Sequence, residues 1–444
     1  MRAGVSEYYG VTLKSTEDLK TAACCTKAAP PKQVRAILAR VPAEITSRYY
    51  GCGSPFPAAG LLRGRRVVDL GCGTGRDVYV ASALVGERGA VIGVDMTEAQ
   101  LEVGRRHAPG WAHELGFARP NVSFVIGRIE DLPQTKEEEE FEGSDANAPP
   151  PPSSVPANWA DVIISNCVIN LSPDKPAVLR GAFATLAPGG EMHFSDVYCS
   201  RRLSRAAREH PVAVGECLGG ALYSDDFLSL CRDAGFARPR VAAAREFEVF
   251  DAELKEVLGA DARFFSVTFR VFKLKGEEGG ACWAKEEQKK GGGGCCGGGG
   301  SKATAAAAAS NDDTAVVPDD AARGFAVGGC QDFGQTATYL GTVEEHPESF
   351  ELDLTASFEK GKPKRVCAAT AAALARTWLA PHFSVTAPGA HRGAFCPSPC
   401  GSAGCGSSAA TMQRLAEQED AKAAAAAEGA GAAAKGACGG GKCC

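Results

Sequence analysis

RVVDLGCGTG, the stretch at positions 66–75, decides the fold class of this 444-residue chain. Its first half, RVVDL at 66–70, is apolar and β-branched, and it predicts a buried strand. Gly71, Gly73 and Gly75 follow, and glycine lets the backbone turn sharply and approach a ligand closely. A buried strand that passes through such a turn into a helix is typical of a doubly wound α/β domain.

Apolar runs alternate with helical runs on both sides of this stretch. We expect further strands at 90–95, 122–127, 160–166, 190–197 and 264–274. We expect helices at 31–41, 97–116, 176–186 and 225–235. The second of these helices should open on a capping box that runs from Thr97 to Gln100. The alternation predicts a doubly wound α/β domain over 60–275.

Segments of biased composition divide the rest of the chain. Residues 133–158 contain EEEE and PPPP, which predicts a solvated insertion between the third and fourth strands. Residues 276–329 contain GGGGCCGGGG and an alanine run, the composition of a linker. Residues 330–412 regain aromatic residues and predict a small α+β domain, whereas 413–444 return to Ala, Gly and Cys and predict a disordered tail. We treat 1–59 as a cysteine-bearing N-terminal segment packed on the core.

The bulk composition excludes several classes of protein. The net charge of −5 gives no general attraction to nucleic acid or to an anionic membrane. No apolar run approaches the roughly 18 residues that a membrane span needs, and residues 1–20 lack the apolar core of a secretory signal. The 19 cysteines are an odd number, so they cannot all pair within one chain. We therefore expect a cytoplasmic protein whose thiols are functional.

The glycine loop and a second acidic residue predict a site for a cofactor that contains adenosine. A dinucleotide fingerprint requires G-x-G-x-x-G, but Arg76 stands at the last glycine position, which disfavours NAD. Asp95 ends the next expected strand, 20 residues after Gly75, where a carboxylate can accept hydrogen bonds from both hydroxyls of a ribose. The loop resembles that of class I S-adenosylmethionine methyltransferases, in which Ile129 and Glu130 would flank the adenine. A tight strand-to-helix turn without a ligand is the alternative.

Several cysteines outside the low-complexity segments take distinctive positions. Cys167 directly follows Asn166 at the carboxyl end of an expected strand, and in a doubly wound sheet that edge faces the cofactor. The other candidates are the adjacent pair Cys24 and Cys25, Cys52 in YYGCG and Cys217 in GECLGGA. A lone cysteine is most often a small buried apolar residue, and we expect that role for Cys72, Cys199 and Cys231.

Together these stretches resemble the arsenite S-adenosylmethionine methyltransferases. The matching motifs are DLKTAACC, RYYGCGSPFP, DLGCGTGRDVY, SNCVINL, GECLGGALY, TYLGTVEEHPESFELD and GKPKRVCAATA. The resemblance implies a Rossmann-like class I methyltransferase domain, followed by a small C-terminal α+β domain and a disordered tail. It also implies contacts with S-adenosylmethionine by Tyr50, Asp69, Gly71, Gly73, Gly75, Asp95, Met96, Ile129, Glu130 and Asn166.

The resemblance further implies that thiols do the chemistry. Cys167 and Cys217 would hold trivalent arsenic with Cys52 as a further ligand, and Cys24 and Cys52 would serve chiefly in redox. Trivalent arsenic is soft and prefers thiolates, and its lone pair can attack the sulfonium methyl without a general base. Only seven histidines occur, and none lies in the cofactor or thiol motifs. Methyl transfer oxidises arsenic formally, so two further thiolates would return two electrons by closing a disulfide, which an external dithiol would reopen.

The implied function is arsenite methylation for arsenic detoxification, giving mono- and dimethylated arsenicals, with trimethylation left open. The implied partners are arsenite, methylarsenite, their glutathione conjugates, and thioredoxin or glutathione as reductant; we expect a monomer that binds no nucleic acid and no membrane. Two alternatives remain. A methyltransferase for carbon or oxygen would not need Cys167 and Cys217, and a thiol protein that sequesters soft metals would not need Asp69, Gly71 and Asp95. Cys396, Cys400 and Cys405 resemble a fragment of a metal knuckle but lack the spacing of a zinc motif.

Overall fold

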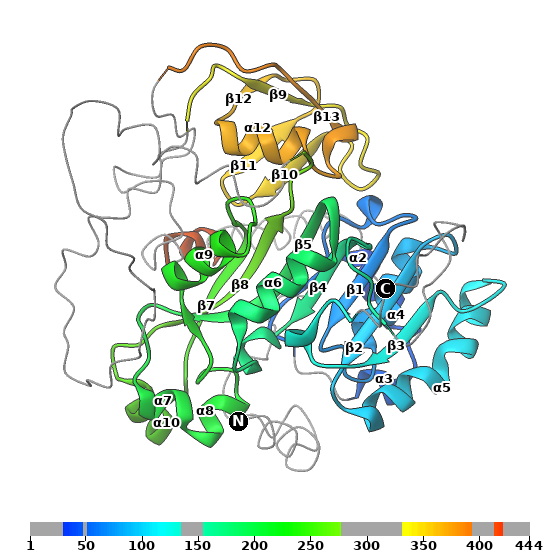
Figure 1. The fold of residues 1–444 in the computed structure, drawn as a ribbon, viewed down its shortest axis with the longest axis vertical. Coiled ribbons are helices and arrows are strands. Elements are labelled where there is room, and N and C mark those ends of the chain that lie inside the picture. The colour runs from blue at the N-terminus through cyan, green and yellow to red at the C-terminus, as the bar shows by residue number, and fades with distance from the viewer. Residues whose placement is uncertain (1–29, 48–50, 135–153, 277–330, 393–412, 421–444) are drawn as a thin grey trace, which may run out of the picture.

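The computed structural model describes residues 30–47, 51–134, 154–276, 331–392 and 413–420 (Figure 1). Several predicted features therefore lie outside the described residues: Cys24, Cys25, Tyr50, most of the insertion 133–158, nearly all of the linker, and Cys396, Cys400 and Cys405. In the described ranges, no helix has the length and apolarity that crossing a membrane requires.

A mixed sheet of eight strands forms the centre of the molecule, with the order β3-β2-β1-β4-β5-β8-β7 and β6 paired with β5. The strands are β1 (Arg66–Leu70), β2 (Ala90–Asp95), β3 (Val122–Ile126), β4 (Ala160–Asn166), β5 (Leu186–Cys199), β6 (Leu222–Tyr223), β7 (Arg240–Phe247) and β8 (Phe264–Phe272). The first five strands pair in parallel, and β8 runs antiparallel to both β5 and β7. The chain order reverses between β1 and β4, so the carboxyl ends of these strands form the edge where an open α/β sheet binds its ligand.

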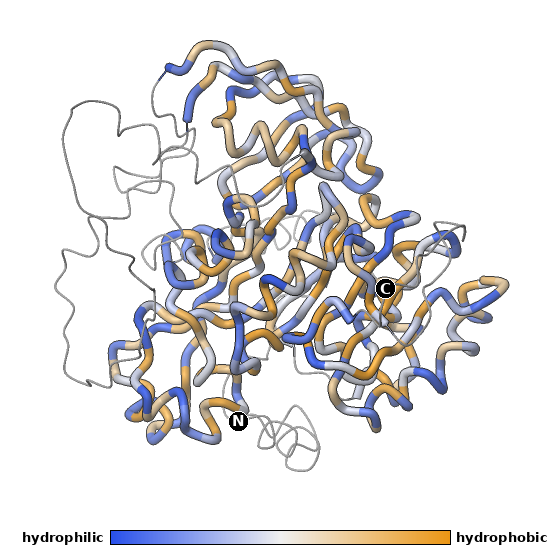
Figure 2. Tube along the Cα trace, viewed as in Figure 1, coloured by the Kyte–Doolittle hydropathy of each residue, from blue (hydrophilic) through white to orange (hydrophobic). Residues whose placement is uncertain are grey.

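Helices cover both faces of the sheet, which explains why strands such as β1 and β2 are apolar along most of their length. Neighbouring side chains of β1 lie on opposite faces of the sheet, since Val67 packs in one hydrophobic cluster and Val68 packs in the other. The first cluster contains α2 (Lys32–Leu38), α4 (Arg76–Val85) and α5 (Glu98–Leu115), and the second contains α6 (Lys175–Thr185) and α9 (Ser224–Asp233). The shorter helices are α3 (Ala43–Thr46), α7 (Arg205–Glu209), α8 (Pro211–Gly215) and α10 (Ala252–Leu258). Hydrophobic residues accordingly concentrate along the central strands (Figure 2).

The doubly wound α/β prediction is confirmed, although several local features differ from the expectation. Thr97 is the N-cap of α5, but its side chain makes no capping hydrogen bond, so the predicted capping box is wrong. The reason is that Asp95 accepts a hydrogen bond from the Thr97 amide at 2.9 Å and draws this turn towards the carboxyl end of β2. Strand β7 was not expected, because its alanines and charged residues do not resemble a buried strand.

The C-terminal domain is small and mixed, as predicted, and lies at the top of Figure 1. It contains β9 (Thr336–Tyr339), β10 (Ser349–Asp353), β11 (Ala356–Glu359), β12 (Lys364–Arg365), α12 (Ala368–Ala375) and β13 (Phe383–Val385). Its aromatic core of Tyr339, Phe350 and Phe383 belongs to the same hydrophobic cluster as Phe272 and Val67 of the central sheet. The two domains therefore share one continuous core.

Residues 413–420 form a helical segment, although we expected a disordered tail to begin at 413. Leu415 and Ala416 are buried in the hydrophobic cluster that includes β7. The Glu419 carboxylate accepts a hydrogen bond from the Ala244 amide at 2.8 Å. Strand β7 ends the sheet, so its outer amides need partners from outside the sheet, and this segment supplies one.

We expect truncation to separate this segment from the residues that follow it. Removing 421–444 should leave the free energy of unfolding nearly unchanged. Removing 413–444 should lower it by about 1–3 kcal/mol, because the Ala244 amide loses its partner and apolar area on β7 is exposed. Urea unfolding of both truncated chains measures the difference, and equal stabilities would show that the segment contributes nothing to the fold.

Candidate active site

The loop between β1 and α4 has a backbone that only glycine accommodates easily. Gly71, Gly73 and Gly75 have φ angles of +71°, +54° and +94°, which lie in the left-handed region. A Cβ atom on Gly71 would lie 2.3 Å from Val168, and one on Gly75 would lie 2.6 Å from Phe124. These glycines thus allow the loop to pack closely against Val168 and Phe124.

Three carboxylates surround this loop. Asp95 accepts a hydrogen bond from the Gly73 amide at 3.0 Å. Burial raises the pKa of Asp69 well above its usual value, and the nearby Asp77 and Asp95 raise it further. Arg76 pairs with Asp77 at 2.7 Å and is the one cation that opposes this effect on Asp69. A cation bound here would favour the ionised form of these carboxyl groups, so the site suits a ligand that carries a sulfonium and an ammonium group.

Apolar side chains lie exposed at the same edge of the sheet. Met96 is 42% exposed and Ile126 is 50% exposed, and Ile126 is the register partner of Asp95. Ile129 is buried and Glu130 accepts a hydrogen bond from Ser172 at 2.8 Å. Apolar walls beside an acidic strand end fit an adenosine, so the residues present suit S-adenosylmethionine. Ile126 was missed from the sequence, where its only signal is an apolar residue at the carboxyl end of a strand.

Three of the predicted cysteines come together beside this edge. Cys52, Cys167 and Cys217 are at most 3% exposed and belong to one buried cluster. The Cys217 thiol donates a hydrogen bond to the Cys167 carbonyl at 3.2 Å. Burial raises the pKa of Cys52, and a hydrogen bond with the Cys167 side chain opposes that rise. Cys72, Cys199 and Cys231 are buried too, as expected of structural cysteines.

Cys167 and Cys217 have an unusual backbone. Both have a φ of +61°, and among the described residues other than glycine only Asn158 also has a positive φ. Such conformations cost on the order of 1–3 kcal/mol each and persist where the surroundings enforce them. Here the two segments press together, because a Cβ on Gly220 would lie 1.8 Å from the Asn170 carbonyl oxygen. The left-handed backbone singles out these two cysteines as candidates for the site.

Comparisons with known proteins agree with this combination of sites. The family model for a methyltransferase domain matches residues 61–235, and the model for the arsenite methyltransferase C-terminal domain matches residues 334–444. The arsenite methyltransferase of Aquipseudomonas alcaligenes is 40% identical over 383 residues, which are 86% of this chain and 90% of that protein. The chain belongs to the arsenite methyltransferase family.

Two further relatives support this assignment. The arsenite methyltransferase of Mus musculus is 44% identical over 275 residues, which cover 62% of this chain and 68% of that protein. The crystal structure of an arsenic(III) S-adenosylmethionine methyltransferase from Chlamydomonas reinhardtii matches with a TM-score of 0.65 and 40% identity. That match covers 83% of this chain and 100% of the other. The protein is therefore an S-adenosylmethionine-dependent methyltransferase.

Asn166 connects the first turn of α4, which follows the glycine loop, to the Cys52 loop of this arsenite methyltransferase homologue. Its Oδ1 accepts hydrogen bonds from the amides of Cys52 at 3.0 Å and Gly53 at 3.3 Å. Its Nδ2 donates to the Gly53 carbonyl at 2.9 Å and lies 3.5 Å from Asp77. We predicted Asn166 as a cofactor contact, and in the structure its side chain holds the Cys52 loop.

Asp196 is an acidic residue of the thiol site that sequence reasoning missed. It is 1% exposed, and its pKa is raised to about 8. Burial is the largest cause of this rise, and the neighbouring Cys217 also contributes to it. The amides of Asn170 and Val197 donate to its carboxyl oxygens at 3.0 and 2.8 Å. Within the described ranges, no three His, Cys, Asp or Glu side chains are grouped as a metal site.

We expect Asp95→Ala to weaken S-adenosylmethionine binding by about 1–3 kcal/mol, the scale of hydrogen bonds to a charged group. Calorimetric titration of the full chain with the cofactor measures this loss. Asp131→Ala is the control, because Asp131 lies half-exposed in a surface pair with Arg128. Unchanged affinity in the Asp95 variant would contradict a role for this carboxylate in holding the ribose.

Proposed function

We propose that the protein transfers methyl groups from S-adenosylmethionine to trivalent arsenic held by cysteine thiolates. The observation that carries this proposal is the burial of Cys52, Cys167 and Cys217 in one cluster, joined through Asn166 to Asp77 in the first turn of the helix that follows the glycine loop. A methyltransferase for carbon or oxygen has no need of such a cluster. A thiol protein that only sequesters arsenic has no need of the glycine loop and its carboxylates.

The thiols would supply binding and orientation. When bound, S-adenosylmethionine supplies an electrophilic methyl group on a sulfonium. Three thiolates around arsenic leave its lone pair available, so no protein base has to remove a proton during the attack. The described residues then contribute mainly position, and holding two reactants in a near-attack geometry can supply about 7–11 kcal/mol.

Arsenic transfer from a glutathione conjugate is compatible with the raised pKa of Cys52. Each exchange forms a bond between arsenic and a protein sulfur and breaks one between arsenic and a glutathione sulfur. The proton of the protein thiol leaves with the released glutathione, so the step conserves protons. We therefore propose that arsenite and methylarsenite enter as thiol conjugates.

The redox balance requires two further electrons for each methyl group. Methyl transfer takes arsenic formally from the trivalent to the pentavalent state. Two cysteine thiolates can return it to the trivalent state by closing a disulfide, and an external dithiol such as thioredoxin then reduces that disulfide. We propose Cys52 and Cys24 for this role, although Cys24 lies outside the described residues. Such a cycle needs a reducing compartment, which favours the cytoplasm.

One incubation tests the proposed function against both alternatives. The full chain is supplied with arsenite, S-adenosylmethionine, glutathione and a thioredoxin system, and arsenic species are separated over time. We expect methylarsenicals first and dimethylarsenicals later, with detoxification as the consequence in the cell. Arsenic that stays bound but unmethylated would favour sequestration, and no interaction with arsenic at all would favour a methyltransferase for an organic substrate.

A further inference from the structure

A row of polar side chains lies on one face of β5 and β8, where a buried sheet usually carries apolar residues. The row consists of Glu191, His193 and Ser195 on β5 and Ser266, Thr268 and Arg270 on β8, and we call it the polar face. The register pairs His193 with Arg270 and Ser195 with Thr268, so these side chains are direct cross-strand neighbours. All six are less than 9% exposed.

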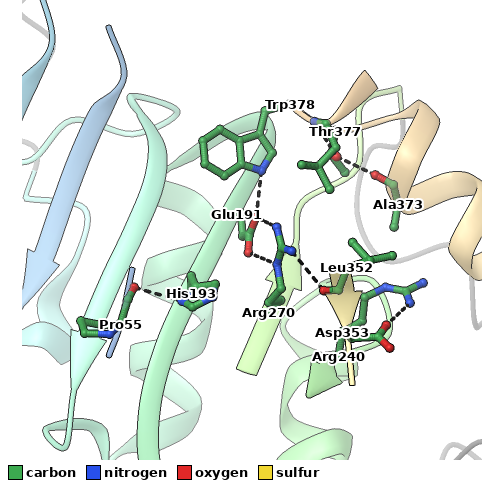
Figure 3. A network of polar contacts seen from close by, with 11 residues as sticks. Pro55, Glu191, His193, Arg240, Arg270, Leu352, Asp353, Ala373, Thr377 and Trp378 are labelled. Carbon is green, nitrogen blue, oxygen red and sulfur yellow. Dashed lines mark hydrogen bonds and ion pairs between the residues drawn. The ribbon is translucent and has the colours of Figure 1, made fainter. Parts of the chain in front are cut away.

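The C-terminal domain holds one end of the polar face (Figure 3). Glu191 and Arg270 form two hydrogen bonds of 2.6 and 2.8 Å and are 0% and 4% exposed. From the C-terminal domain, Trp378 Nε1 donates to Glu191 at 2.8 Å, and the Leu352 carbonyl accepts from Arg270 at 3.0 Å. Breaking a buried ion pair is costly, so these domain contacts fix where both charged side chains lie.

The other end of the polar face holds the loop that carries Cys52. The Ser266 hydroxyl donates to the Cys52 carbonyl at 2.7 Å, and a Cβ on Gly53 would lie 2.5 Å from the Ser195 hydroxyl. The Pro55 carbonyl lies 3.0 Å from Nδ1 of His193, which must carry the proton because a carbonyl can only accept. The loop thus rests on three residues of the polar face.

His193 stands between the two ends. Its pKa is lowered to about 4, and burial is the largest cause. Glu191 raises the pKa and Arg270 lowers it, and both of these effects are smaller than that of burial. The imidazole therefore stays neutral and keeps the Nδ1 proton that it donates to Pro55. A shift of the Glu191–Arg270 pair would change the packing of His193 directly, because Arg270 is its cross-strand partner.

We propose that the C-terminal domain positions the Cys52 loop through the polar face, which makes Trp378 and His193 positioning residues for the thiol site. The consequence for catalysis rests on the proposed role of Cys52 in arsenite methylation. The positioning itself can be measured without it, because Cys52 is 1% exposed and its thiol can react with a reagent only when the loop opens.

Trp378→Phe in the full chain is the first test, since it removes the indole N–H but keeps an aromatic ring. N-ethylmaleimide labelling of Cys52, followed by mass spectrometry under native conditions, should be at least fivefold faster than in the unaltered protein. Methylation of arsenite should fall by a similar factor, while methylation of methylarsenite changes less than twofold. Trp111→Phe is the matched control, because Trp111 is buried and its indole N–H has no hydrogen-bond partner in the described structure.

His193 provides a second, independent pair of variants. Asn can place an amide N–H where Nδ1 lies, whereas Leu fills the space without a donor. We expect His193→Leu to speed Cys52 labelling as Trp378→Phe does, and His193→Asn to restore slow labelling. This comparison tests whether His193 holds the Cys52 loop, whereas Trp378→Phe tests the role of the C-terminal domain.

The outcomes separate the positioning from the proposed function. Slow Cys52 labelling in Trp378→Phe would overturn the role of the C-terminal domain, and slow labelling in His193→Leu would overturn the role of His193. Equally fast labelling in Trp111→Phe and Trp378→Phe would overturn it too, because general destabilisation would then explain the result. Labelling that is fast in Trp378→Phe and slow in Trp111→Phe, with unchanged arsenite turnover, would support the positioning. It would contradict the role of Cys52 as a redox thiol and arsenic ligand.

Discussion

Replacing Cys167 or Cys217 by serine is expected to abolish the methylation of both arsenite and methylarsenite. A hydroxyl is a hard ligand and binds trivalent arsenic poorly, whereas the lost thiolate is soft. The decrease in kcat/KM should be at least about a hundredfold, because even the loss of an outer partner of a metal ligand costs 10–100-fold. Arsenic speciation with each substrate measures the effect.

Cys231→Ser is the matched control for these two variants. Cys231 is as deeply buried, but it packs in the hydrophobic cluster of α9, away from Cys52, Cys167 and Cys217. We expect it to lower stability and to leave turnover of the folded fraction within about threefold, in line with a buried cysteine that only packs. If Cys167→Ser kept the turnover of methylarsenite, Cys167 could not be an essential arsenic ligand.

Cys52→Ser and Cys24→Ser are expected to separate the two methylation steps. Arsenite needs three sulfur ligands, but methylarsenite already has one arsenic–carbon bond, so two thiolates suffice to bind it. Both variants should therefore lose the methylation of arsenite by about a hundredfold or more, as expected for a lost ligand or redox partner. Both should retain much of the methylation of methylarsenite.

The measurement is a comparison of the two substrates in the same preparation. Cys25→Ser is the control for Cys24→Ser, because the two cysteines are adjacent and only one is expected to act. The division of labour would be wrong if Cys24→Ser lost methylarsenite turnover as completely as Cys167→Ser does.

Most of the fold follows from local sequence patterns. Strands such as 66–70 and 160–166 were predicted because both of their faces are buried, which leaves a continuous apolar run. Strand β7 was missed, since an edge strand covered by other segments needs neither a run nor an alternation. The helical segment at 413–420 was missed for a related reason: its few apolar residues become informative only when β7 is present to bury them.

The candidate site was predictable where a sequence motif marks it. Gly71 and Gly73 could be named because their loop follows a buried strand, and Cys167 and Cys217 because their motifs resemble those of the arsenite methyltransferases. Asp196 could not, because an acidic residue in a strand becomes notable only when burial and a neighbouring thiol raise its pKa. The support of the Cys52 loop is a tertiary property of β5 and β8, so no local pattern contains it.

The hydrophobic cluster that joins Phe272 of the sheet to Tyr339 and Phe350 of the C-terminal domain bears on how the chain could be divided. When one part is made alone, the apolar surface that it shares with the other part is exposed to solvent and can bind that part. Two polypeptides that end and begin within 277–330 would thus be expected to recognise each other and reassemble as a split enzyme. The interface would supply the affinity, and the covalent connection would serve only to raise the local concentration of one part near the other.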